Sequence, residues 1–135
     1  MKQDLINGTN DEYYTHEYSI TPLLKYIKKG TTLWCPFDPP QSRFVTELEK
    51  HGCNVIRTHI DENGDFFEIP TPECDYIISN PPYSCKTQVF KKLFEIGKPF
   101  AMLVGIEGIF GSKERFELFK NNPPEIMYFN TRVKY

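Results

Sequence analysis

The sequence lacks the features that define several protein classes. No apolar run in its 135 residues approaches the length of a membrane-spanning helix, and no apolar signal segment follows the N-terminus, so we expect a cytoplasmic protein without membrane contact. A formal charge of -2 provides no overall basic surface for nucleic acid. No Cys-x-x-Cys pair or nearby pair of histidines suggests a metal site, and we expect reduced, mostly buried thiols at Cys35, Cys53, Cys74 and Cys85.

Length and composition predict one folded domain. With 39% hydrophobic and 15% aromatic residues, the chain can bury one core but is too short for two ordinary domains. Residues 1–12 are polar and offer nothing to bury, so we expect a flexible N-terminal arm there. A single domain is expected over residues 13–135.

Short apolar segments alternate along the chain with segments of helical periodicity. The apolar segments predict strands at 31–37, 54–60, 75–79, 100–104 and 125–130. The periodic segments predict helices at about 21–29, 42–51 and 112–120, and a further helix with an apolar face made of Val89, Phe90, Leu93 and Phe94. This alternation predicts an α/β fold in which helices cover both faces of a mostly parallel sheet.

Three loops after predicted strands contain polar or unusual residues. In open α/β sheets ligands bind at the carboxyl ends of the strands, so these loops are candidate sites. The loops are 36–38, the segment from Asp61 to 67, and the Asn-Pro-Pro-Tyr segment at 80–83. The last is the most specific, because two rigid prolines hold an asparagine and an aromatic residue in a fixed relation. The alternative is a plain strand-terminating turn, since Asn and Pro are common turn residues.

The Asn-Pro-Pro-Tyr segment resembles the Asn/Asp-Pro-Pro-Tyr/Phe motif of S-adenosylmethionine-dependent amino-methyltransferases. Over about residues 13–130, the sequence is most similar to short, phage-type adenine-N6 DNA methyltransferase-like proteins. The resemblance implies a Rossmann-like methyltransferase sheet, S-adenosylmethionine as cofactor and adenine N6 in DNA as the methyl acceptor. Because related enzymes act on RNA bases or on protein glutamine amides, RNA and protein acceptors stay open.

The resemblance also implies roles for the residues of the motif. The side-chain oxygen of Asn80 and the backbone carbonyl of Pro81 would accept the two protons of the amine and so orient its lone pair. Pro82 completes the rigid turn, and Tyr83 would stack on a base flipped out of its duplex.

Two segments resemble the family's elements around the methionine part of the cofactor. Tyr14 and Thr15 belong to a motif that closes over the cofactor. Pro36, Phe37 and Asp38 resemble an Asp/Asn-Pro-Phe variant of the first loop, with Asp38 receiving the cofactor ammonium group. The loop contains no glycine, whereas the usual family loop is rich in glycine. A helix-capping role for Asp38 is the alternative.

Two further segments resemble the elements around the cofactor's adenosine part. Asp61 takes the place of a carboxylate that binds the ribose hydroxyls, and Asp65 with Phe66 would flank the adenine. The alternatives are a solvated turn residue for Asp61 and an ordinary core side chain for Phe66.

The predicted sheet raises a second functional hypothesis. Relative to the family, we expect the chain to be shortened at its C-terminal side, because no final hairpin strand or recognition segment follows 125–130. The alternative is a fragment whose remaining half supplies DNA recognition. An exposed sheet edge favours a homodimer or a protein partner that covers it. The second hypothesis is therefore a catalytically inactive methyltransferase-like fold that acts as a phage-encoded, protein-binding inhibitor of a host nuclease defence. The glycine-free loop favours this inhibitor, and the retained Asn-Pro-Pro-Tyr segment favours catalysis.

Overall fold

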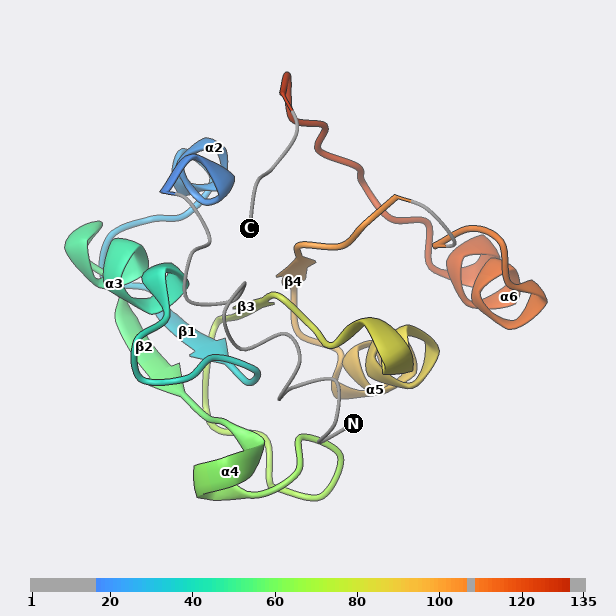
Figure 1. Cartoon of the computed structure of the whole chain (residues 1–135), viewed down its shortest axis with the longest axis horizontal. Helices are drawn as coiled ribbons and strands as arrows, with labels where there is room; N and C mark the ends of the chain where they lie inside the picture. The colour runs from blue at the N-terminus through green and yellow to red at the C-terminus, as the bar shows by residue number, and fades with distance from the viewer. Residues whose placement is uncertain (1–16, 107–108, 132–135) are drawn as a thin grey trace.

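The computed structural model of the chain describes residues 17–106 and 109–131 (Figure 1). The predicted N-terminal arm therefore lies outside the described residues. One all-parallel sheet has the strand order β2-β1-β3-β4. Its strands are β1 (Thr32–Cys35), β2 (Asn54–Arg57), β3 (Tyr76–Ser79) and β4 (Phe100–Met102).

Helices lie on both faces of this sheet. The longer ones are α3 (Arg43–Lys50), α5 (Lys86–Ile96) and α6 (Lys113–Asn121), and the short ones are η1 (Glu17–Ser19), α2 (Thr21–Leu24), α4 (Ile60–Asn63) and η2 (Tyr83–Cys85). Figure 1 shows α2 and α3 on one side of the sheet and α5 and α6 on the other. The predicted α/β class, with a parallel sheet and helices on both faces, is confirmed.

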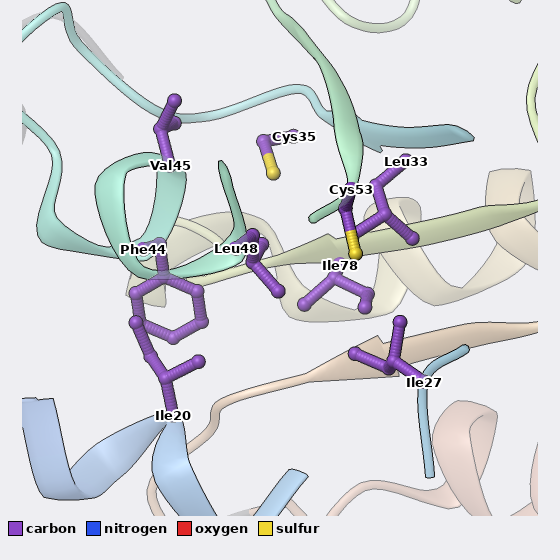
Figure 2. Close-up of a cluster of buried hydrophobic side chains, with 9 residues drawn as sticks. All are labelled: Ile20, Ile27, Leu33, Cys35, Phe44, Val45, Leu48, Cys53 and Ile78. Carbon is purple, nitrogen blue, oxygen red and sulfur yellow. The ribbon is translucent and has the colours of Figure 1, made fainter. Parts of the chain in front are cut away.

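The two faces of the sheet contribute to two separate core clusters, because successive side chains of a strand point to opposite sides. In β1, Leu33 and Cys35 belong to the cluster with α3, while Trp34 belongs to the cluster with α5 and α6. In β3, Ile78 and Ile77 divide in the same way. Figure 2 shows the first cluster, in which side chains from α3, β1 and β3 converge. These strand residues are at most 1% exposed, so each aliphatic side chain contributes about 1.5–3 kcal/mol.

Several predicted elements are shorter than the sequence suggested, among them the strands predicted at 31–37 and 100–104. The helix predicted at 21–29 ends at Leu24, because Tyr26 and Ile27 donate to carbonyls three residues back and continue the chain as turns. The strand predicted at 54–60 ends at Arg57, whose partner Cys35 is the last residue of β1. The following residues are thereby free to begin α4.

The strand predicted at 125–130 is wrong. This segment forms no strand in the structure, and Ile126, Met127 and Tyr128 are 49%, 44% and 72% exposed. Its apolar residues suggested a buried strand, but no neighbouring strand within the described residues pairs with it. In the described part of the chain, the sheet edge on this side is therefore β4.

Candidate functional site at the switch point of the sheet

The chain reverses its winding between β1 and β3. It continues from β1 to β2 on one side of the sheet and from β3 to β4 on the other. Such a switch point forms a crevice at the carboxyl ends of the two central strands, where ligands bind in this class of sheet. The segments after β1 and β3 meet there, and the backbone N–H of Phe37 donates to Ser79 Oγ at 3.3 Å.

Asp38 is buried between these segments and joins them. Its Oδ1 accepts a hydrogen bond from Ser42 Oγ at 2.6 Å, and its Oδ2 accepts one from Ser79 Oγ at 2.5 Å. Arg57 Nη1 donates to the Asp38 backbone carbonyl at 3.1 Å. Burial raises the pKa of Asp38, while the two serine hydroxyls, His59 and Arg57 act in the opposite direction.

Asp38 therefore joins the two segments and does not cap α3, whose N-cap residue is Ser42. Both carboxylate oxygens already have a donor within the protein, and the residue is only 4% exposed. Ser42 is the N-cap residue of α3; its hydroxyl makes no capping hydrogen bond and donates to Asp38. In this arrangement Asp38 holds the glycine-free loop against the end of β3.

Asn80 follows β3 directly and begins the Asn-Pro-Pro-Tyr segment. Its Oδ1 is buried and has no hydrogen-bond partner among the described residues. An unpaired buried carbonyl costs about 1–3 kcal/mol, so the site retains this acceptor at a cost in stability. Pro81 and Pro82 are buried, and their fixed backbone geometry positions Asn80 at the end of the strand.

A small pocket lies beside this segment. It is lined by Pro36, Phe37, His59, Ile60, Asp65, Phe66 and Pro82, which come from the loops after β1, β2 and β3 and from the turn at 65–69. Its enclosed volume is about 20 Å³, the room of roughly one water molecule. Only one edge of a larger ligand can therefore enter without movement of the lining side chains.

Asp65 and Phe66 form one wall of this pocket. Phe66 is 3% exposed, and its ring centroid lies 4.8 Å from that of Phe37 and 5.4 Å from that of Trp34. Phe66 is therefore both a core side chain and a pocket wall, which joins the two interpretations of this residue. Asp65 Oδ1 accepts a hydrogen bond from the backbone N–H of Phe67 at 3.0 Å, which fixes the carboxylate at the pocket.

Asp61 does not line the pocket, whereas His59 does. Because β2 ends at Arg57, Asp61 belongs to α4, where its side chain is 62% exposed. His59 is the N-cap residue of α4 and is 8% exposed. Sequence reasoning missed His59 because the predicted strand at 54–60 placed it inside a strand; its position just after β2 is the signal that could have found it.

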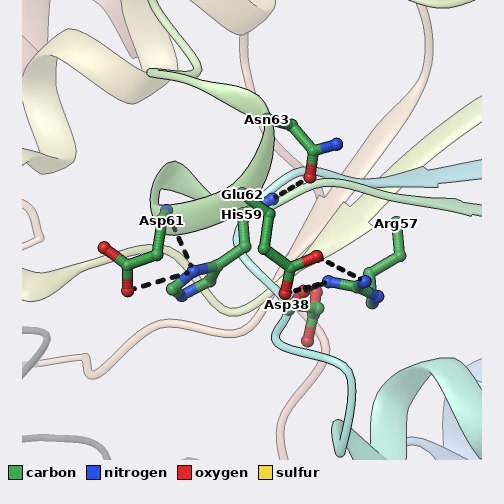
Figure 3. A network of polar contacts seen from close by, with 6 residues as sticks. All are labelled: Asp38, Arg57, His59, Asp61, Glu62 and Asn63. Atoms are coloured by element: carbon green, nitrogen blue, oxygen red, sulfur yellow. Dashed lines mark hydrogen bonds and ion pairs between the residues drawn. The ribbon is translucent and has the colours of Figure 1, made fainter.

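Polar contacts attach α4 to the end of β2, as Figure 3 shows. Arg57 forms a two-pronged ion pair with Glu62, with Nη1 3.3 Å from Oε1 and Nη2 2.8 Å from Oε2. The hydrogen bonds from Arg57 lower the pKa of Glu62. Asn63 Oδ1 accepts a hydrogen bond from the His59 backbone N–H at 3.2 Å. These contacts keep the turn at His59 in one position relative to the strand.

Within the described part of the chain, the predicted site residues thus fall into three groups. Five of them share the pocket, namely Pro36, Phe37, Asp65, Phe66 and Pro82. Asn80, Pro81 and Asp38 lie at the adjoining strand ends, and Asp61 lies apart on α4. Tyr14 and Thr15 lie outside the described residues, as does the side chain of Tyr83.

Among residues 17–106 and 109–131, no three His, Cys, Asp or Glu side chains are grouped so that they could hold a metal ion. No helix in the described part of the chain is long and apolar enough to cross a membrane. No protein-family model, curated protein or solved structure matches this chain.

Proposed function

We propose that this protein is an S-adenosylmethionine-dependent methyltransferase that acts on a planar exocyclic amine, with adenine N6 in DNA as its acceptor. The strand order β2-β1-β3-β4 supports the proposal, because it places the Asn-Pro-Pro-Tyr segment at the switch point. In this proposal the sheet is the central part of a Rossmann-like methyltransferase fold.

The unpaired Asn80 Oδ1 is the observation that most strongly supports this function. A buried oxygen without a donor in the described part of the protein is suited to a donor supplied by a ligand. The amine of adenine has two N–H groups, while its lone pair is delocalised into the ring. Hydrogen bonds from these N–H groups to Asn80 Oδ1 and to the Pro81 carbonyl would orient the nitrogen for attack.

The pocket residues fit the adenosine part of the cofactor better than its methionine part. Phe37, Phe66 and the prolines offer flat apolar walls, and Asp65 presents a carboxylate. Asp38 is 4% exposed and each of its oxygens accepts a hydrogen bond from a serine, so its carboxylate presents little surface to an ammonium group. When bound, S-adenosylmethionine supplies an electrophilic methyl group. The amine nitrogen would form a bond to the methyl carbon as the sulfur–carbon bond breaks, and would then lose a proton to water.

Methyl transfer to adenine-containing DNA, with labelled cofactor, tests the proposal. Asn80→Ala should lower the rate at least about 100-fold, because it removes an acceptor at the reacting amine. Asn121→Ala, at the exposed end of α6, is the matched control and should leave the rate unchanged. Full activity in Asn80→Ala would refute the mechanism, and transfer to RNA or a glutamine peptide instead of DNA would change the acceptor.

A catalytically inactive fold that binds another protein is the second candidate. The exposed apolar side chains Ile126, Met127 and Tyr128 favour it, because contiguous exposed apolar residues often mark a protein contact. Under this alternative, S-adenosylmethionine would not bind, and replacing these three residues with lysine would abolish partner binding. The same triple variant should keep its methyltransferase activity if the first candidate is right.

A further inference from the structure

His59 is a polar residue of the pocket that the proposed transfer does not use. It lines the pocket beside Phe37 and Phe66 and is 8% exposed. Its backbone is fixed, because its carbonyl accepts hydrogen bonds from the N–H groups of Glu62 and Asn63 at 3.1 and 2.9 Å. The side chain is therefore held at the pocket by a rigid turn.

The ring of His59 also has a defined orientation. The backbone N–H of Asp61 donates to Nδ1 at 3.3 Å, so in the neutral ring the proton is on Nε2. The Asp61 Oδ2 atom lies 3.5 Å from the same Nδ1. Figure 3 draws this contact between the two side chains. Nε2 makes no hydrogen bond to another residue in the described part of the chain, which leaves its N–H available to a ligand.

Two polar residues, His59 and Asp65, thus stand among the apolar walls of the pocket. His59 can donate a hydrogen bond from Nε2–H. Asp65 can accept one, because within the described residues only its Oδ1 accepts a hydrogen bond, from the Phe67 N–H. A flat ring with an exocyclic amine and a neighbouring unprotonated nitrogen complements this pair.

We propose that His59 is a ligand-binding residue that donates from Nε2 to an acceptor atom of an adenine nucleoside. Asp61 is a positioning residue, because its backbone N–H holds Nδ1 in the acceptor form. The inference rests on the proposed function, in that S-adenosylmethionine is the nucleoside concerned. It adds His59, which sequence analysis did not name, to the residues around the adenosine part of the cofactor.

Two substitutions separate this role from the capping role of His59. Asn in place of His59 keeps a short acceptor for the Asp61 N–H and remains a good N-cap, but it cannot present a donor at the Nε2 position. Gln reaches further and restores a donor there while it weakens the cap. A purely structural role for His59 therefore predicts that His59→Asn is nearly silent and His59→Gln is harmful.

The experiment is calorimetric titration of the wild type and both variants with S-adenosylmethionine and with S-adenosylhomocysteine. We expect His59→Asn to bind both about tenfold more weakly at unchanged melting temperature, and His59→Gln to recover part of the affinity. In the wild type, the nitrogen NMR signal of His59 Nε2 should shift on addition of either compound.

The possible failures are distinguishable. If the wild type and His59→Asn bind equally and the Nε2 signal is unmoved, the inference is wrong while the proposed function stands. If neither compound binds the wild type, the proposed function fails and the inference fails with it. If His59→Asn lowers the melting temperature, the other two measurements test the inference. Recovered affinity in His59→Gln together with a shifted wild-type Nε2 signal supports it, and the absence of both refutes it.

Discussion

Asp38 is a buried carboxyl group whose closest partners are two neutral hydroxyls, and its pKa is raised chiefly by burial. The folded state therefore binds the Asp38 proton more tightly than the unfolded chain, where the pKa is about 3.9. The resulting contribution to stability is fully present below about pH 4 and is lost as the pH rises through the raised pKa, with a slope of at most about 1.4 kcal/mol per unit.

Asp38→Asn should remove this pH dependence. We expect the free energy of unfolding of the wild type, relative to that of Asp38→Asn, to fall as the pH rises from about 4. Urea unfolding of both proteins at a series of pH values measures this difference and cancels contributions from other carboxylates. A difference that grows with pH would mean that hydrogen bonding, not burial, controls this carboxyl group.

Asn80 should show a conflict between stability and function. Its buried Oδ1 has no partner among the described residues, so Asn80→Ala removes an acceptor that costs about 1–3 kcal/mol. The small cavity left behind offsets part of this gain, and we expect the free energy of unfolding to rise by about 1 kcal/mol. Thermal and urea unfolding check this value. A loss of more than about 1 kcal/mol would indicate that Oδ1 has a stabilising partner.

At the residue scale, the position of the Asn-Pro-Pro-Tyr segment could be predicted from the sequence, but the residues around it could not. Asn80 and the two prolines could be placed because a strand and a helix signal flank them. Ser79 could not, because its role depends on Asp38, a side chain 41 residues away, and such a hydroxyl contact has no local pattern. His59 was missed for a different reason, because the strand predicted at 54–60 extends past the true end of β2 at Arg57.

Ser79 connects two elements, the loop after β1 and the end of β3. Its Oγ donates to Asp38 Oδ2 and accepts from the Phe37 N–H, while Ser42 supplies only one donor to the same carboxylate and comes from the loop that leads into α3. Ser79→Ala should therefore cost about 2 kcal/mol or more, and more than Ser42→Ala. Urea unfolding of the two variants gives the comparison. An equal or smaller loss in Ser79→Ala would show that the loop and β3 are joined mainly by other contacts.

A predicted strand was correct where its segment pairs with neighbouring strands and is buried between helices. The strands at 31–37 and 75–79 were located because their apolar residues are buried on both faces of a central position. The segment 125–130 has a similar composition but remains exposed, so composition alone did not distinguish a core strand from a surface segment. β2 ends at Arg57 because its partner strand β1 ends at Cys35. The residues of β2 themselves contain no pattern that predicts this end.

At the scale of the whole molecule, β1 and β3 are shared by both core clusters. Leu33 and Trp34 are adjacent in the chain but belong to opposite clusters, and each is 0% exposed. One face cannot lose its packing without exposing the strands that the other face needs. We therefore expect the two clusters to unfold in one cooperative transition.

Leu48 and Leu93 test this cooperativity from opposite faces. Each is 0% exposed, Leu48 in the cluster with α3 and Leu93 in the cluster with α5, so each change to alanine should cost about 2–5 kcal/mol. Trp34 is the only tryptophan and lies in the cluster with Leu93, so its fluorescence reports one face, while circular dichroism reports both.

If the faces are coupled through the strands, Leu48→Ala should shift the fluorescence and circular dichroism transitions together, as Leu93→Ala does. If Leu48→Ala splits the dichroism transition and leaves the Trp34 transition in place, the faces unfold separately. In that case β1 and β3, which form the switch point, would keep only their packing against α5 and α6.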